Sequence, residues 1–179
     1  MSRPTPRGSV LVAGIGNIFL GDDGFGVETV RALAGRPLPD HVEVADIGVR
    51  GVHLAYQLLD GYDTLILVDA TARGEAPGTL YVIEHEDVGA DEPGHAPLDG
   101  HRMTPDAVLA LLGTLCATAG GRPPRRTLVV GCEPACVEER MGLSAPVSEA
   151  VPQAVRLIEE LLDTPPESVR RPLAGEAAK

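Results

Sequence analysis

The chain has 179 residues, of which 44% are hydrophobic, only 3% are aromatic and none is tryptophan. This length fits a single domain, and its core must be built from Val, Leu, Ile and Ala. The formal net charge of −11 at pH 7 disfavours binding to nucleic acids or anionic membranes, because their phosphates repel an acidic surface.

The sequence predicts a cytoplasmic protein without membrane insertion. No apolar run approaches the length of a membrane span, and residues 1–9 lack the apolar segment of a signal peptide. The odd number of cysteines, Cys116, Cys132 and Cys136, suits a reducing compartment. Cys132 and Cys136 lack the second ligand pair that a zinc site requires. Nothing in the sequence demands more than a monomer.

The first half of the chain alternates strands and helices. Apolar runs predict buried strands, an alternating run predicts an edge strand, and apolar residues at helical spacing predict the helices between them. The expected strands are 10–13, 42–46 (the edge strand) and 64–70, with helices marked by Val27, Val30 and Leu33 and by Val52, Ala55, Leu58 and Leu59. This order is typical of a parallel sheet with helices on its faces.

The second half adds two strands and two helices. The strand 79–83 follows 64–70 after only eight residues (71–78), too few for a crossover helix, so we expect it to pair antiparallel with 64–70. Thr104, Pro105 and Asp106 predict a helix start. A fifth strand is expected at 127–131, followed by a last helix marked by Val151, Val155, Ile158 and Leu162, with Pro152 in its first turn or at a kink.

The fold class that follows is α/β: a three-layer sandwich with a mostly parallel twisted sheet of about five strands, one antiparallel edge strand and helices on both faces. Residues 1–163 are expected to form one domain. Residues 164–179 are rich in proline and polar residues and are expected to form a flexible tail.

The first strand leads into the glycine loop LVAGIGNIFLGDDGFG, residues 11–26. A dinucleotide-binding fingerprint would need Gly or Ala where this chain has Phe19. Glu43 or Asp46 fits only loosely the position of an acid that binds ribose. A nucleotide-binding oxidoreductase is therefore a weak alternative.

Acidic residues follow two of the predicted strands. Asp22 and Asp23 come after the first strand, Asp69 ends the strand 64–70, and His101 precedes the helix that starts near Thr104. Because the carboxyl ends of parallel strands meet at one edge of a sheet, these side chains are candidates for a divalent-metal site, since carboxylates and imidazole suit nickel or zinc.

Simpler roles remain open for each candidate. Asp22 or Asp23 would also stabilise the N-terminus of the next helix, and this is the better interpretation of Asp22 alone. Asp69 would also hold a turn through backbone amides. His101 would simply be solvated, and His95 is a near rival for its place.

Four segments in order resemble the [NiFe]-hydrogenase maturation endopeptidases. They are VAGIGNIFLGDDGFG, LILVDA, HRMTPDAVLALL and VVGCEPACVEERMGLSAPV, and the match spans about residues 10–163. The resemblance implies a peptidase that removes a short C-terminal extension from the hydrogenase large-subunit precursor after nickel insertion. The nickel in the precursor then serves as the recognition element.

Carried across from the family, the residues that contact nickel are Asp23, Asp69 and His101. Many members have Glu where this chain has Asp23. No zinc-protease or serine-nucleophile motif is present, and no nucleophile is apparent, although Cys132 follows a strand as a nucleophile would. The hypothesis for the chemistry is an aspartic-type hydrolysis in which Asp23 or Asp69 activates water.

A second hypothesis from a different class keeps the metal site without catalysis, as a nickel-binding maturation chaperone. The segments 71–78 and 84–100 flank Asp69 and precede His101, so we expect them to contact the partner protein. Which hydrogenase is served, and how long the removed peptide is, do not follow from these residues.

Overall fold

The computed structural model describes residues 8–85 and 104–164. Five strands form one sheet with the order β2-β1-β3-β5-β4, in which only β4 runs antiparallel to its neighbour. The strands are β1 (Val10–Ile15), β2 (Val42–Gly48), β3 (Thr64–Ala70), β4 (Leu80–His85) and β5 (Arg126–Cys132).

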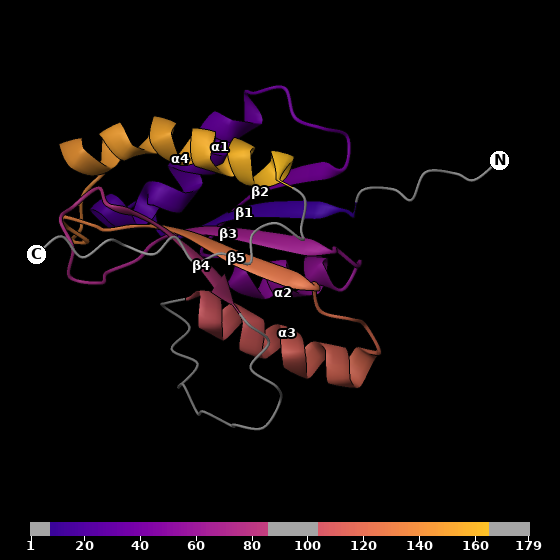
Figure 1. The fold of residues 1–179 in the computed structure, drawn as a ribbon. Helices are drawn as coiled ribbons and strands as arrows, with labels where there is room; N and C mark the ends of the chain where they lie inside the picture. Colours follow the sequence, from indigo (N-terminus) through magenta and orange to yellow (C-terminus); the bar gives the residue numbers. More distant parts are fainter. Residues whose placement is uncertain (1–7, 86–103, 165–179) are drawn as a thin grey trace, which may run out of the picture.

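Helices cover both faces of this sheet (Figure 1). On one face α1 (Phe25–Ala34) packs beside α4 (Ala145–Asp163), and on the other α2 (Gly51–Leu58) packs beside α3 (Pro105–Ala119). Each face has its own buried cluster, one around Phe25, Ile66 and Ile158 and the other around Leu54, Leu67 and Leu112. The predicted three-layer α/β sandwich is confirmed.

Burial along the strands follows their positions in the sheet. The apolar central strands β1, β3 and β5 are buried over nearly their whole length, whereas β2 and β4 expose residues along theirs. A strand flanked on both sides and covered on both faces leaves no room for polar side chains. The prediction that 42–46 is an edge strand is therefore confirmed.

The predicted partner of the strand 79–83 is wrong, although an antiparallel edge strand is present. β4 pairs with β5, with Val82 opposite Val130, while β5 pairs in parallel with β3, with Leu67 beside Val129. β5 therefore lies between β3 and β4. The wholly buried pattern of β5 and the alternating pattern of β4 explain this order, because only the alternating strand tolerates an open edge.

Two helices differ in detail from their sequence patterns. In α2 the buried residues include Leu54, Ala55 and Leu58, while Val52 is 52% exposed. α4 begins at Ala145, so Pro152 lies inside the helix and not in its first turn. Pro152 has no N–H to donate to the Ser148 carbonyl, which removes one hydrogen bond from the helix.

The start of α3 agrees with its predicted cap. The Thr104 side chain accepts a hydrogen bond from the Ala107 N–H at 3.3 Å, and Pro105 occupies the first helical position. This cap satisfies one of the backbone donors that a helix start leaves without an intrahelical partner.

Two glycines bring α1 into backbone contact with the sheet. A Cβ at Gly26 would lie 2.1 Å from the Val68 carbonyl oxygen and 2.4 Å from that of Ile15, and a Cβ at Gly14 would lie 2.3 Å from the Gly26 carbonyl oxygen. Only glycine permits this approach. The first turn of α1 is thereby fixed above the carboxyl ends of β1 and β3.

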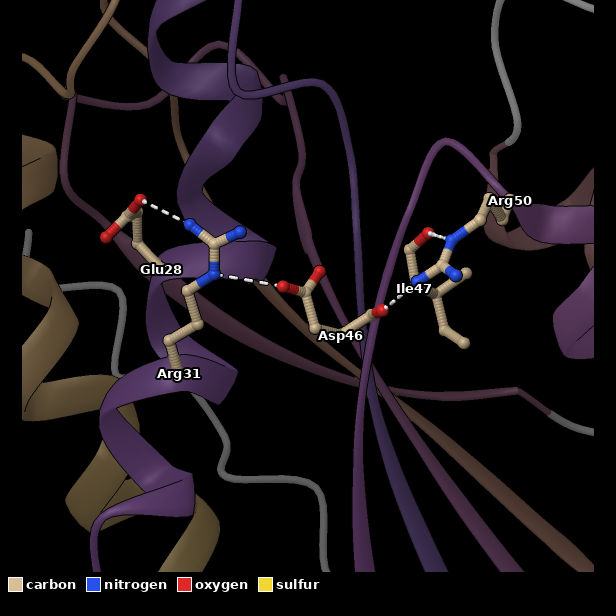
Figure 2. A network of polar contacts seen from close by, with 5 residues as sticks. All are labelled: Glu28, Arg31, Asp46, Ile47 and Arg50. Carbon is tan, nitrogen blue, oxygen red and sulfur yellow. Dashed lines mark hydrogen bonds and ion pairs between the residues drawn. The ribbon is translucent and has the colours of Figure 1, made fainter.

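An ion-pair network joins α1 to the end of β2 (Figure 2). The Arg31 guanidinium contacts Asp46 at 2.9 Å and Glu28 at 3.6 Å, while Arg50 donates to the backbone carbonyls of Asp46 and Ile47. The side chains are about half exposed, so each ion pair contributes no more than about 1 kcal/mol. The network mainly fixes the orientation of the segment that connects β2 to α2.

Within the residues that the structure describes, no helix is both long and apolar enough to cross a membrane.

Candidate active site

The loops that follow β1, β3 and β5 lie at one edge of the sheet, on the left of Figure 1. This edge holds the carboxyl ends of the parallel strands, where α/β proteins place their functional groups. The structure brings Asp23 and Asp69 to this edge, as the sequence predicts.

Asp69 is a buried carboxyl group at the end of β3, with 8% of the residue exposed. Burial and the negative charge of Asp23 raise its pKa well above the usual value, while a hydrogen bond from the Ala70 backbone partly opposes them. Burial disfavours the ionised form, and so does a second carboxylate nearby. A strongly perturbed carboxyl group at the edge of the sheet is typical of an active site.

Asp23 lies in the short 3₁₀ helix η1 (Gly21–Gly24), immediately before α1. Its carboxylate accepts a hydrogen bond from the Asn17 N–H at 2.8 Å, and the Asn17 side chain accepts one from the Phe19 N–H at 2.9 Å. Gly16, with a φ of +127°, makes the preceding turn. The glycine loop is therefore held by its own hydrogen bonds, and these fix Asp23 at a position from which its charge acts on Asp69.

Asp22 has a different role from its neighbour and from the predicted one. It is fully buried, and its carboxylate accepts hydrogen bonds from the backbone N–H groups of Ala135, Cys136 and Ser144 and from the Ser144 hydroxyl, at 2.7–3.0 Å. Burial alone would raise its pKa, but these hydrogen bonds together lower it. Asp22 thus fastens the loop after β5 to the glycine loop, whereas stabilisation of a helix N-terminus was expected.

A cleft of about 670 Å³ opens beside Asp69. Its walls are formed by the segment that follows β3, by β4 and by the start of α3. The lining residues are Asp69, Ala70, Thr71, Ala72, Arg73, Ile83, His85, Thr104, Pro105, Asp106 and Val129. The His85 imidazole lies 3.6 Å from the Asp106 carboxylate across this cleft.

The third predicted metal-contacting residue, His101, lies outside the described residues, and so does its rival His95. Within residues 8–85 and 104–164 no group of three or more His, Cys, Asp or Glu side chains is arranged to hold a metal ion. The described part of the site is therefore the carboxylate pair Asp23 and Asp69. Any third contact has to come from beyond these ranges or from a bound partner.

Other candidate residues have structural roles. Cys132 is fully buried, and burial with the nearby charges of Asp22 and Glu133 raises the pKa of its thiol to about 12, which is unsuited to a nucleophile. Glu43 accepts hydrogen bonds from Tyr62 and Gln57, and Asp46 pairs with Arg31. Both acids are therefore already engaged by other side chains.

Sequence reasoning missed Glu133, which directly follows β5 at the same edge of the sheet. It is 6% exposed and organises the segment 71–78, whose first three residues line the cleft. Its position after a buried strand is the same signal that identified Asp69, and applying that signal to the fifth strand would have found it.

The fold and this edge define an α/β protein with paired acidic side chains beyond the carboxyl ends of its central strands. The family model for hydrogenase maturation proteases matches residues 27–161. The chain therefore belongs to the hydrogenase maturation protease family and is a peptidase.

Individual relatives agree with this assignment. The chain is 35% identical over 161 residues to the hydrogenase expression/formation protein HupD of Rhizobium leguminosarum bv. viciae, covering 89% of this chain and 76% of the relative. It is 34% identical over 152 residues to the hydrogenase 2 maturation protease of Escherichia coli K12, covering 83% of this chain and 87% of that protein. The structure of the hydrogenase maturating endopeptidase HybD from E. coli superposes with a TM-score of 0.67 at 32% identity, covering 86% of this chain and 91% of the other.

Proposed function

We propose that this peptidase removes the C-terminal extension of a [NiFe]-hydrogenase large-subunit precursor after nickel insertion, and that it contacts the substrate-borne nickel through Asp23, Asp69 and His101. The observation that carries the proposal is the pair Asp23 and Asp69 at the carboxyl edge of the sheet, in a chain of this family. Two carboxylates with room for further ligands suit a divalent cation carried by a partner.

The covalent chain supports a contribution from His101. His101 lies three residues before Thr104, which lines the same cleft as Asp69. Three residues span at most about 11 Å. On this short connection we propose the imidazole as the third ligand, which would complete a set of two carboxylates and one nitrogen.

The proposed chemistry is hydrolysis of one peptide bond by water. Asp69 keeps its proton to a higher pH than an ordinary aspartate, and a group with a raised pKa exchanges protons effectively near neutral pH. Asp23, held by the Asn17 N–H, would orient the metal-bearing end of the substrate. In this aspartic-type scheme a water molecule attacks the scissile carbonyl while one carboxylate takes a proton from that water. The carboxyl group then gives the proton to the leaving amine.

The decisive experiment mixes the purified protein with a precursor from the same source, in nickel-loaded and nickel-free forms. Mass spectrometry follows the precursor. We expect loss of a C-terminal peptide only from the nickel-loaded form, and none with the Asp23→Asn variant. Arg156→Ala, an exposed change on α4, is the matched control and should process normally.

A non-catalytic chaperone is the second candidate, since it would use the same carboxylate pair. It predicts a stable complex with the precursor and no change in its mass, together with tight binding of free nickel. The peptidase scheme predicts weak binding of free nickel, because the substrate would supply most ligands. Calorimetry with nickel chloride separates the two.

The site of action proposed for the protein is the cytoplasm, and its proposed form is a monomer. Three free cysteines suit a reducing compartment. Gel filtration coupled to light scattering would test the oligomeric state.

A further inference from the structure

The wall of the cleft next to Asp69 is an ordered structure built around a buried carboxylate. Glu133 accepts hydrogen bonds from the backbone N–H groups of Arg73 at 2.8 Å and Gly74 at 3.2 Å, and from the Tyr81 hydroxyl at 2.7 Å. The positive φ of Gly74, +87°, allows adjacent N–H groups to converge on one anion. This wall, residues 71–78, is therefore fixed by Glu133.

The backbone of Glu133 secures the far end of the same wall. The Gly78 N–H donates to the Glu133 carbonyl, and the Glu133 N–H donates to the Thr79 carbonyl, each at 2.8 Å. The wall is thus held at both ends by one residue, which directly follows β5.

The guanidinium of Arg73 does not form an ion pair with Glu133, although both belong to this wall structure. Its guanidinium lies over the Tyr81 ring, 5.6 Å from the centroid, while its backbone N–H donates a hydrogen bond to the Glu133 carboxylate. Among the described residues no carboxylate forms an ion pair with Arg73. This cation–π contact favours one orientation of the exposed Arg73 side chain and leaves its N–H groups for another partner.

The position of Arg73 in the cleft indicates what that partner is. Arg73 and Asp69 line the same cavity, and Arg73 is the one arginine or lysine among its described lining residues. The rest of the protein carries a strong negative charge. A planar cation held on such a surface selects for a carboxylate, which it binds through paired hydrogen bonds.

We infer that Arg73 is a specificity residue that binds a carboxylate of the substrate polypeptide, and that Glu133 and Tyr81 position it. The inference rests on the proposed function for the identity of the substrate. The carboxylate belongs either to an acidic side chain near the scissile bond or to the C-terminus of the precursor. Both present the same chemistry to the guanidinium.

The test measures processing of the nickel-loaded precursor at several concentrations. Arg73→Ala should raise KM about tenfold or more, the usual cost of a lost charge-assisted pair, and leave kcat within about twofold. Arg73→Lys should recover part of the loss, and Arg156→Ala should show none. An unchanged KM for Arg73→Ala, or an equal loss for Arg156→Ala, would overturn the inference.

Precursor variants identify the carboxylate. Acidic residues of the C-terminal segment are changed singly to Asn or Gln, and a separate variant carries added glycines that displace the terminal carboxylate. One of these changes should raise KM for the wild-type enzyme and have no further effect with Arg73→Ala. Fully additive losses throughout would contradict a direct contact.

Binding to the nickel-free precursor separates failure of this inference from failure of the proposed function. The Kd of this complex is measured for the wild type and for Arg73→Ala, and the variant should bind about tenfold more weakly. If the wild type fails to process the loaded precursor, the proposed function is wrong, and the Kd ratio still decides the role of Arg73. Equal Kd values would contradict the role of Arg73. If the wild type binds only the nickel-loaded precursor, the same comparison is made with that form, and equal affinities there would contradict the role.

Discussion

Two buried aspartates, Asp22 in the glycine loop and Asp69 at the end of β3, have opposite environments. The Asp22 carboxylate is surrounded by hydrogen-bond donors that together lower its pKa, whereas burial and the negative charge of Asp23 raise the pKa of Asp69. The first arrangement stabilises the folded protein when the group is ionised, and the second opposes ionisation. Asp22 thus has a structural role, whereas Asp23 and Asp69 form the proposed functional pair.

The substitution Asp69→Asn should remove activity and stabilise the protein. An unfolded aspartate ionises near pH 4, but folded Asp69 keeps its proton to higher pH. Stability is therefore lost as pH rises between these values, and the cost remains at pH 7. We expect processing to fall at least about 100-fold and the free energy of unfolding to rise by about 0.5–2 kcal/mol at pH 7.

Urea unfolding from pH 4 to 7 and the precursor assay measure the two effects of Asp69→Asn. The gain in stability should shrink as the pH falls towards 4, because the folded wild-type group then regains its proton and no longer carries the cost of a buried charge. Normal processing by this variant would disprove the role given to Asp69. A loss of stability at pH 7 would disprove the prediction that the ionised Asp69 side chain destabilises the folded protein.

The substitution Asp22→Asn should have the opposite effect on stability. The lowered pKa of folded Asp22 means that its stabilisation is present above about pH 4 and is lost as pH falls through the folded pKa. Replacing this acceptor leaves backbone donors poorly satisfied, and we expect a cost of about 3 kcal/mol at pH 7.

The difference between Asp22→Asn and the wild type should narrow as the pH is lowered below about 4. Urea titrations followed by circular dichroism measure it. Asp40→Asn, at an exposed position, is the control and should change stability by less than about 0.5 kcal/mol. A cost as small as that of the control would show that the four hydrogen bonds of Asp22 do not stabilise the loop.

At the scale of elements, helix α1 determines where Asp23 lies. The helix follows Asp23 directly, and Gly26 in its first turn rests on the carbonyl oxygens of Ile15 and Val68. Because Val68 precedes Asp69, the same contact sets the spacing between the two carboxylates. A shift of α1 on the sheet should therefore change the distance between the carboxylates of Asp23 and Asp69.

The substitution Gly26→Ala tests this coupling. The new Cβ would lie 2.1 Å from a backbone oxygen that cannot rotate away, so α1 must shift. We expect a loss of about 1–3 kcal/mol in stability and, since a displacement of about 1 Å matters in catalysis, a fall of about 100-fold in processing. Thermal unfolding and the precursor assay measure both.

Gly113→Ala is the matched control in another helix. No atom lies within 4 Å of a Cβ at that exposed position, so the substitution should stabilise α3 by about 0.5–1 kcal/mol and leave processing unchanged. A similar loss in both variants would mean that the tight approach of Gly26 is not responsible.

At the scale of the whole molecule, the family match ends at residue 161, and Leu162 is the last of the described residues that packs against the core. The predicted tail, residues 164–179, lies beyond the family match, and we predict that the fold does not depend on it. A chain that stops after Thr164 should unfold within about 0.5 kcal/mol of the full chain and should process the precursor within about twofold. A larger loss in either measurement would show that the tail belongs to the domain.

Much of the fold was predictable because each element carries a local signal. The apolar runs at 64–70 and 127–131, the cap at Thr104 and the alternating run at 42–46 have the structures that their patterns predict. The pairing of β4 was not predictable from the spacing after β3, since spacing fixes the direction of a strand and leaves its neighbour open.

The candidate site divides in the same way. The sequence alone determined the fold class and the edge of the sheet where Asp23 and Asp69 lie, because the succession of strands and helices along the chain and the position of an acid after a strand are local properties. Only the tertiary structure decided that Asp22 fastens a loop more than 110 residues away, that Gly26 sets the place of Asp23, and that Glu133 orders the wall carrying Arg73. Each of these depends on atoms that the chain brings together only when the sheet and its helices pack, and no spacing along the sequence records such contacts.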